Sequence, residues 1–424
     1  MNELSADWVL PVSGPPIANG LVRWEGSRIV EVTTGRAARH VADAAILPGF
    51  VNAHSHLEYS TYAGFGDGRP FGPWLQTHVR RKRALDREGM LALARRGAWD
   101  SLASGITTTA DYSFSGDAAT AAEEAGLRAI VYLEVFARDP AVAEAQFAEK
   151  RTRVEETELV TIGVSPHAPY TCSLDVYRWC LSLGIPVGTH LAESSHEHLW
   201  LESGAGPLAE APRDVLVPPT GKRTVASLEP VLGPDLLCAH CVDLTAGEIA
   251  LLGERRVPIA HCPRSNSLLG CGIAPITELR AAGAVVGLGT DSPASAPSFD
   301  VFEELRTAVY LARARERSAA ELGADEALRL ATLDAARALR LDAEVGTLEA
   351  GKRADLAVVS LAGSPYHPVE DPAAAVVFGG SPERVVETIV DGITRYRSDE
   401  RGAKWQEARS TSSAARARML AAEP

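Results

Sequence analysis

A regular alternation of two kinds of segment constrains the fold of this chain more than any other feature. Short apolar segments rich in Val and Ile alternate with longer segments rich in Ala, Leu, Arg and Glu, which is the pattern of parallel strands joined by crossover helices. Eight strands are predicted, at roughly 47–53, 107–111, 129–135, 160–165, 186–189, 236–239, 257–261 and 284–289. The predicted helices between them include 88–104, 118–125, 141–156, 174–182, 246–252 and 276–282. This series predicts an α/β fold, a (β/α)8 TIM barrel over residues 47–342.

The two chain ends have a different pattern. Strand-like stretches separated by turn residues occur at 20–24, 28–32, 346–359, 375–378 and 384–390. Neither end has enough strands to bury a core alone. We therefore expect residues 1–46 and 343–398 to form one small composite β-sandwich domain. Residues 399–424 are predicted to be either a terminal helix or a partly disordered tail.

The first predicted barrel strand ends in two histidines, His54 and His56, that lie one residue apart. Side chains at i and i+2 of a strand share one face, so both imidazoles can point at one site. Most isolated H-x-H pairs bind nothing, but three other predicted strands also end in a residue that can bind a metal. These residues are His190, His240 and Asp291. The carboxyl ends of the strands form the active site of a TIM barrel, so we expect the five side chains to meet there.

As a set, these motifs resemble the amidohydrolase superfamily, and in particular its cytosine deaminase/chlorohydrolase-like branch. The matching segments are H-S-H at 54–56, P-H-A-P-Y at 166–170, H-L-A-E at 190–193, His240, H-C-P-R-S-N at 261–266, Asp291 and the turn-rich segment 346–355. The resemblance implies attack by metal-bound hydroxide on a C–N bond of an amidine-like heterocycle, with release of ammonia. It also implies that Glu193 shuttles protons, that His240 hydrogen-bonds the attacking water or the oxyanion, and that Asp291 takes the water proton.

The number of metal ions is also implied by the resemblance. Binuclear members of the superfamily bridge two ions with a carboxylated lysine or a glutamate at the fourth strand, and no lysine lies between residues 160 and 167 of this chain. We therefore expect one divalent ion with an open position for water. Zn²⁺ is the expected ion, and Fe²⁺ or Mn²⁺ would accept a similar site. The expected ligands are His54, His56, His190 and Asp291.

The region after the first strand resembles the aminodeoxyfutalosine deaminases. It contains L-E-Y-S at 57–60, a Gly-rich loop from Gly64 to Gly72, P-W-L at 73–75 and a basic run at 80–83. Those enzymes act in menaquinone biosynthesis on an adenine nucleoside whose sugar carries a carboxyphenyl group. The resemblance therefore implies a substrate of this kind.

Individual roles follow from this interpretation. Glu58 would hydrogen-bond a ribose hydroxyl, and Phe71 or Trp74 would pack on an aromatic ring. Arg264 or a residue of the basic run would meet the carboxylate, and His167 is a further predicted substrate-binding residue. Alternatively, Trp74 belongs to the core of a helix and the basic run is an exposed helix face.

Other functions stay open. The substrate can instead be adenosine, methylthioadenosine or S-adenosylhomocysteine, or a guanine- or triazine-type compound handled by a deaminase or chlorohydrolase, and ring opening of a cyclic amide is a further alternative. The chain has the complete set of expected ligands together with Glu193 and His240, which argues against a different class of protein, a non-catalytic amidohydrolase-like scaffold.

Composition limits the partners. With 42 basic and 55 acidic residues the formal charge is −13, which argues against binding to nucleic acid. No apolar stretch approaches the roughly 18 residues of a membrane-spanning helix, and the N-terminus has no signal-peptide pattern. We therefore expect a cytoplasmic enzyme that acts on a small molecule without a membrane partner, and a symmetric homodimer as the commonest form of assembly.

Overall fold

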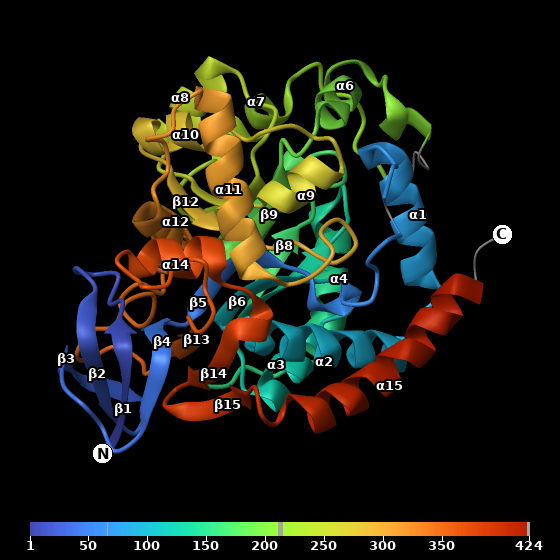
Figure 1. Cartoon of the computed structure of the whole chain (residues 1–424). Coiled ribbons are helices and arrows are strands. Elements are labelled where there is room, and N and C mark those ends of the chain that lie inside the picture. Colours follow the sequence, from blue (N-terminus) through green and yellow to red (C-terminus); the bar gives the residue numbers. More distant parts are fainter. Residues whose placement is uncertain (66, 211–214, 422–424) are drawn as a thin grey trace.

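The computed structural model describes residues 1–65, 67–210 and 215–421, which form two sheets (Figure 1). The larger sheet is parallel, with its eight strands in the order β12-β11-β10-β9-β8-β7-β6-β5. They are β5 (Phe50–Ser55), β6 (Ile106–Ser113), β7 (Arg128–Val135), β8 (Val160–Pro166), β9 (Val187–Leu191), β10 (Leu236–His240), β11 (Pro258–His261) and β12 (Val285–Leu288). The sheet closes because the amide of Asp291, after β12, donates to the carbonyl of His54 in β5 at 2.9 Å. The predicted (β/α)8 barrel is confirmed.

Helices surround the barrel and connect its strands (Figure 1). They are α2 (Arg87–Ala103), α3 (Asp117–Ala125), α4 (Pro140–Arg151), α5 (Leu174–Ser182), α6 (Ser195–Ser203), α7 (Thr224–Leu228), α8 (Ala246–Glu254), α9 (Pro263–Leu268), α10 (Ile276–Ala282), α11 (Val301–Glu316), α12 (Ala324–Leu330) and α13 (Leu333–Ala338). Several begin at a residue whose side chain accepts a hydrogen bond from a first-turn amide, as Asp86, Asp139, Ser173, Thr245 and Asp300 do. No helix within the described ranges is long and apolar enough to cross a membrane.

Strands from both chain ends form the second sheet, in the order β15-β14-β13-β4-β1-β2-β3. They are β1 (Asn2–Val9), β2 (Ile17–Glu25), β3 (Arg28–Thr34), β4 (His40–Pro48), β13 (Leu356–Ser360), β14 (Val385–Val390) and β15 (Ile393–Arg397). The sheet curls until its ends meet, since the indole of Trp24 in β2 donates to the carbonyl of Gly392 in the β14–β15 turn at 3.1 Å. A core that includes Leu4, Ile46 and Leu356 fills the space between them. The composite β-domain is confirmed, while its boundaries at residues 47, 343 and 399 stay predictions.

One predicted strand near the C-terminus is wrong. Residues 375–378 lie in helix α14 (Pro372–Gly379). Asp371 caps this helix by accepting a hydrogen bond from the amide of Ala374 at 2.9 Å, and Pro372 occupies its first turn. Its residues from Pro372 to Val377 are all buried, so the segment has no polar face from which helical periodicity could be recognised.

The last helix, α15 (Arg401–Ala421), runs along α2 toward α1 (Phe71–Arg83) (Figure 1). Met419 is fully buried in a cluster with Tyr62. The guanidinium of Arg416 donates to the carbonyl of Thr61. The helix therefore fastens the loop that follows the first barrel strand. Residues 422–424 of the predicted tail and Gly66 of the predicted Gly-rich loop lie outside the described residues.

Buried charges join the barrel to the β-domain. Arg128, the first residue of β7, lies 3.2 Å from Asp355 and 2.6 Å from Asp391, measured between guanidinium nitrogen and carboxylate oxygen. Arg128 and Asp355 are 8% and 4% exposed, so the pair is shielded from water. Removing one partner of such a pair leaves an uncompensated buried charge.

We expect Arg128→Met to lower the free energy of unfolding by about 3–5 kcal/mol, because Asp355 would stay buried without its partner. Urea denaturation followed by circular dichroism measures this change. The matched control is Arg95→Met, which breaks the exposed ion pair with Glu124 and should cost only ~0–1 kcal/mol. Equal losses in the two variants would show that the Arg128 cluster does not hold the domains together.

Candidate active site

The four predicted metal ligands meet at the carboxyl end of the barrel. His54 lies in β5 and His56 just after it, His190 lies in β9, and Asp291 follows β12. The Nε2 atoms of His54 and His56 each lie 3.6 Å from Oδ1 of Asp291. Nε2 of His190 lies 3.4 Å from Nε2 of His56. Donors placed about 2.1 Å from a tetrahedral ion are roughly 3.4 Å apart, so these separations suit one shared ion.

The ring of His54 tests whether a metal fits this site. Both of its nitrogens are buried, and neither has a hydrogen-bond partner among the residues that the structure describes. A buried polar atom without a partner is costly, and an ion bound at Nε2 would offset part of that cost. Three imidazoles and one carboxylate form a donor set typical of Zn²⁺ and acceptable to Fe²⁺ or Mn²⁺. The residues present therefore fit one divalent ion.

Hydrogen bonds behind the histidines aim them at the same point. Nδ1 of His56 donates to the carbonyl of Tyr112 at 2.7 Å, and Nδ1 of His190 donates to the carbonyl of His167 at 2.8 Å. Each ring therefore presents the lone pair of Nε2 to the site. Burial lowers the pKa of His56 to about 3 and the pKa of His190 well below its usual value. Both rings are neutral at pH 7, which is the form that binds a metal.

Asp291 is held with one oxygen free to face the histidines. Its Oδ2 accepts hydrogen bonds from the hydroxyls of Ser265 and Ser295 at 2.6 and 2.7 Å, which leaves Oδ1 toward the imidazoles. The backbone of Asp291 has φ +55°, and that of His240 has φ +75°. Such left-handed conformations are uncommon for residues other than glycine and cluster at functional sites.

The predicted proton shuttle, Glu193, and the predicted partner of the attacking water or oxyanion, His240, lie beside the donor set. Glu193 follows β9 and His240 ends β10, and Oε1 of Glu193 is 3.8 Å from Nε2 of His240. Glu193, His240 and Asp291 offer ligand atoms within 4.8 Å of one another. The backbone of Glu193 is fixed because its amide donates to the Glu197 carboxylate at 2.7 Å. Sequence reasoning missed Glu197, although a glutamate four residues after Glu193 is a signal for such a contact.

The floor of the site is a buried tyrosine. The ring of Tyr112 lies under His54, with their centroids 4.4 Å apart. A side chain at Gly188 would place its Cβ only 2.3 Å from the Tyr112 hydroxyl. A glycine two residues before His190 is therefore needed for Tyr112 to support the histidines.

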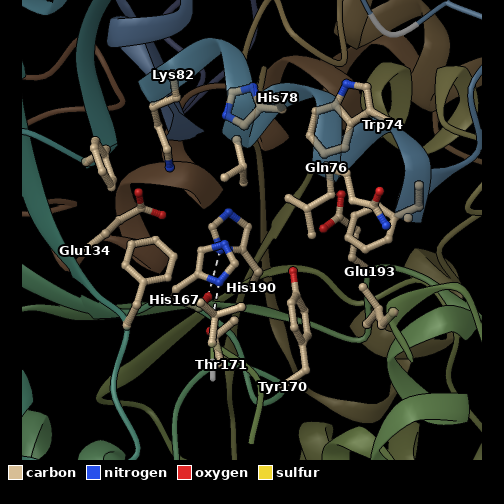
Figure 2. A pocket seen from close by; sticks show the side chains of 18 of the residues that line it. Trp74, Gln76, His78, Lys82, Glu134, His167, Tyr170, Thr171, His190 and Glu193 are labelled. Carbon is tan, nitrogen blue, oxygen red and sulfur yellow. Dashed lines mark hydrogen bonds between the residues drawn. The ribbon is translucent and has the colours of Figure 1, made fainter. Parts of the chain in front are cut away.

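A cavity of about 580 Å³ opens over these groups (Figure 2). This volume falls in the range of small-molecule sites, about 300–1,000 Å³. The predicted residues Phe71, Trp74 and His167 all line it. Trp74 is fixed in the wall, since its indole donates to the carbonyl of Ala294 at 2.9 Å and its ring stacks on His78 with centroids 5.4 Å apart.

Glu58, for which a contact with a ribose hydroxyl was predicted, is not among the residues that line this cavity. Its buried carboxylate accepts hydrogen bonds from the amides of Phe114 and Ser115 and from the hydroxyls of Ser113 and Ser115. These bonds satisfy both oxygens. The physical role of Glu58 is to anchor the loop after β6.

Arg264, for which a contact with a substrate carboxylate was predicted, is not among the lining residues either. The guanidinium is buried and pairs with Glu304 at 2.5 Å and with Glu303 at 2.7 Å. It also donates to the carbonyl of Ser298 at 2.6 Å. These partners occupy the nitrogens that a substrate would need.

The basic run contributes one buried side chain to the cavity. Lys82 is buried in the wall, whereas Arg80 and Arg83 are exposed where they line it. Glu134, which sequence reasoning missed, lines the same region from β7. A single acidic residue in the otherwise apolar end of a barrel strand is the signal that could have found it.

A (β/α)8 barrel whose strand ends carry one metal-donor set beside a buried carboxylic acid, under a cavity for a small molecule, is the architecture of a metal-dependent hydrolase. The model of the amidohydrolase family matches residues 45–394. The chain belongs to this family, and it is a metal-dependent enzyme that hydrolyses C–N bonds other than peptide bonds.

Comparison with known proteins adds individual relatives. The chain is 35% identical over 406 residues to the 5-methylthioadenosine/S-adenosylhomocysteine deaminase of Moorella thermoacetica, covering 91% of each protein. It is 32% identical over 396 residues to the 5′-deoxyadenosine deaminase of Methanococcoides burtonii, covering 89% of this chain and 87% of the relative. The adenosine deaminase of Xanthomonas campestris, solved with bound zinc, has a TM-score of 0.85 and 28% identity, with 98% of each chain covered.

We expect protein purified without chelators to contain close to one divalent ion per chain, because one donor set converges on one point. Elemental analysis measures the ion content. His54→Ala removes a donor and should lose most of the metal, whereas His367→Ala, at an exposed histidine, should retain it. Two ions per chain, or full occupancy in His54→Ala, would contradict the single-ion site.

Proposed function

We propose that the protein hydrolytically deaminates an adenine-type nucleoside and releases ammonia. The position of Glu193 carries this proposal, since its buried carboxyl group lines the cavity beside His240. Burial, reinforced by the charges of Asp291 and Glu197, raises the pKa of Glu193 well above its usual value. A protonated carboxyl group can donate to a ring nitrogen, which prepares an adenine-type ring for loss of its amine. The names of the relatives support the same reaction.

Each group of the site has a role in this reaction. A bound divalent ion would lower the pKa of a water molecule. Asp291 accepts the proton of the attacking water. Glu193 protonates the ring nitrogen and later passes a proton to the departing amine. The residues that would hold the ion are His54, His56, His190 and Asp291, and Zn²⁺ is the proposed ion.

The hydrogen bonds of His240 define its part. Burial lowers the pKa of His240 to about 4, so the ring is neutral. Its Nδ1 donates to Oδ1 of Asn266 at 2.9 Å. Nε2 therefore carries a lone pair and accepts a hydrogen bond from the attacking water, rather than donating one to the oxyanion.

For the substrate, we propose an adenine nucleoside with a carboxylated 5′ substituent, as in aminodeoxyfutalosine, and a place in menaquinone biosynthesis in the cytoplasm. The resemblance of segments 57–60, 73–75 and 80–83 supports this choice. So do Arg80 and Arg83, which are exposed on the cavity wall where a carboxylate at the end of the substituent could reach them.

The second candidate is methylthioadenosine or S-adenosylhomocysteine, favoured by the names of relatives such as the Moorella thermoacetica enzyme. A homodimer stays a prediction.

Glu193→Gln should reduce turnover by roughly 10² to 10⁴ while the metal content stays unchanged, because glutamine keeps the shape of the side chain but cannot transfer the proton. Ammonia release from an adenine nucleoside measures turnover, and elemental analysis measures the metal. Glu124→Gln, at an exposed glutamate on the outside of the barrel, is the control and should keep full activity. Near-normal turnover in Glu193→Gln would remove Glu193 from the mechanism.

Removing the carboxylate from the substrate should lower kcat/KM about ten- to a hundredfold, the effect of losing one charge-assisted contact. The measurement compares ammonia release from the carboxylated nucleoside, adenosine and methylthioadenosine. Equal efficiencies on the three would discard the carboxylated substrate and leave the adenine-nucleoside reaction in place.

A further inference from the structure

Two opposite charges face the same end of the cavity. Lys82 of α1 is 8% exposed and Glu134 of β7 is 2% exposed, and both line the cavity. Figure 2 shows the ammonium group and the carboxylate turned toward one another. Within the part of the chain that the structure describes, neither charged group makes a hydrogen bond or a direct ion pair. The ammonium lies instead 3.8 Å from the ring centroid of Phe114 and 5.4 Å from that of Phe136.

This separation indicates a space for a ligand. Burying a charged group is costly unless the charge is paired and hydrogen-bonded. A purely structural pair of Lys82 and Glu134 would close until nitrogen and oxygen touched. The ammonium nitrogen of Lys82 and the carboxylate oxygens of Glu134 instead stay apart and open to the cavity. A ligand that binds both must accept a hydrogen bond from Lys82 and donate one to Glu134.

A second metal ion does not suit this corner. Glu134, His167 and His190 do offer ligand atoms within 4.8 Å of one another. However, Nδ1 of His190 already donates to the carbonyl of His167, which leaves only the Nε2 that belongs to the first site. The Lys82 ammonium also faces this corner and would repel a dication.

We propose that Lys82 and Glu134 bind the vicinal diol of the ribose, an inference that rests on the proposed deamination of an adenine nucleoside. A ligand carboxylate here would be repelled by Glu134, and a ligand ammonium would be repelled by Lys82. A diol is uncharged, so its hydroxyls can donate to Glu134 and accept from Lys82 at the same time. Glu134 thus takes the role that the sequence had suggested for Glu58.

The order of groups along the cavity agrees with this assignment. Figure 2 shows Glu193 and Tyr170 on one side of His190, and Glu134 and Lys82 on the other. A nucleoside whose ring nitrogen meets Glu193 therefore directs its sugar toward Glu134. The ring of Phe136 packs against His167 with centroids 4.6 Å apart and forms an apolar wall for the sugar.

The test compares the turnover of nucleosides that differ only in their sugar hydroxyls, with the metal-loaded enzyme. Ammonia release is measured with adenosine, 2′-deoxyadenosine and 3′-deoxyadenosine for the wild type, Glu134→Gln and Lys82→Met. The matched control is Lys150→Met, because Lys150 donates to the backbone carbonyl of Glu134 at 2.6 Å and does not line the cavity. Elemental analysis verifies that all variants hold the same amount of metal.

We expect the wild type to prefer adenosine over at least one deoxy analogue by about ten- to a hundredfold in kcat/KM, the range for a hydrogen bond to a charged group. Glu134→Gln and Lys82→Met should lose most of that preference, because they slow adenosine and barely change the deoxy analogue. Lys150→Met should retain it. Equal wild-type rates on the three sugars, or variants that slow all of them alike, would overturn the assignment.

A binding measurement separates this inference from the proposed reaction. Calorimetry with inosine, 2′-deoxyinosine and 3′-deoxyinosine requires no turnover, and wild-type protein should bind inosine more tightly than at least one deoxy analogue. Ammonia release from none of the nucleosides, with inosine still preferred, would overturn the deamination but not the diol site. Equal binding of inosine and both deoxyinosines, with adenosine still deaminated, would overturn the diol site alone. A Glu134→Gln variant that fails to fold leaves Lys82→Met and the wild-type sugar comparison as the deciding tests.

Discussion

The barrel closes at the seam between β5 and β12, and the candidate site depends on that seam. The amide of Asp291 donates to the carbonyl of His54 at 2.9 Å, so the backbone contact that joins the first and last strands also carries two candidate ligands. Oδ1 of Asp291 then lies 3.6 Å from Nε2 of both His54 and His56. The left-handed backbone conformation of Asp291 costs on the order of 1–3 kcal/mol, and the contacts of the closed barrel must offset this cost. The same backbone contact therefore closes the barrel and sets the geometry of the candidate metal site.

Burial acts on the two kinds of ionisable group in the site in opposite directions, and the proposed reaction uses both effects. It lowers the pKa of His56 and His190, so their lone pairs are free for an ion. It raises the pKa of Glu193, so a proton is available for the substrate. A more hydrated cavity would weaken both effects together. The apolar walls that enclose the site therefore contribute to its chemistry as well as to its shape.

The barrel strands and the positions of the candidate ligands could be predicted because both follow from local patterns. An apolar strand that ends at His54 or Asp291 delivers that side chain to the carboxyl edge of the sheet. The contacts of Glu58 and Arg264 could not be predicted, since nothing near them in the sequence reveals the serines that hydrogen-bond Glu58 or the glutamates that pair with Arg264. Lys82 and Glu134, which are far apart in the sequence, line the same cavity only because of the tertiary fold. The strand predicted at 375–378 failed because a helix buried on all sides has no periodic pattern.

The position of α15 after all the candidate ligands in the sequence has a consequence for the order of assembly. All the candidate ligands precede residue 292, whereas Arg416 and Met419, which fasten the loop at Thr61, follow them in the sequence. Because a chain leaves the ribosome from its N-terminus, the metal donors emerge long before the helix that secures the loop beside them. The loop at Thr61 therefore gains its contacts with α15 only after every candidate ligand has been made.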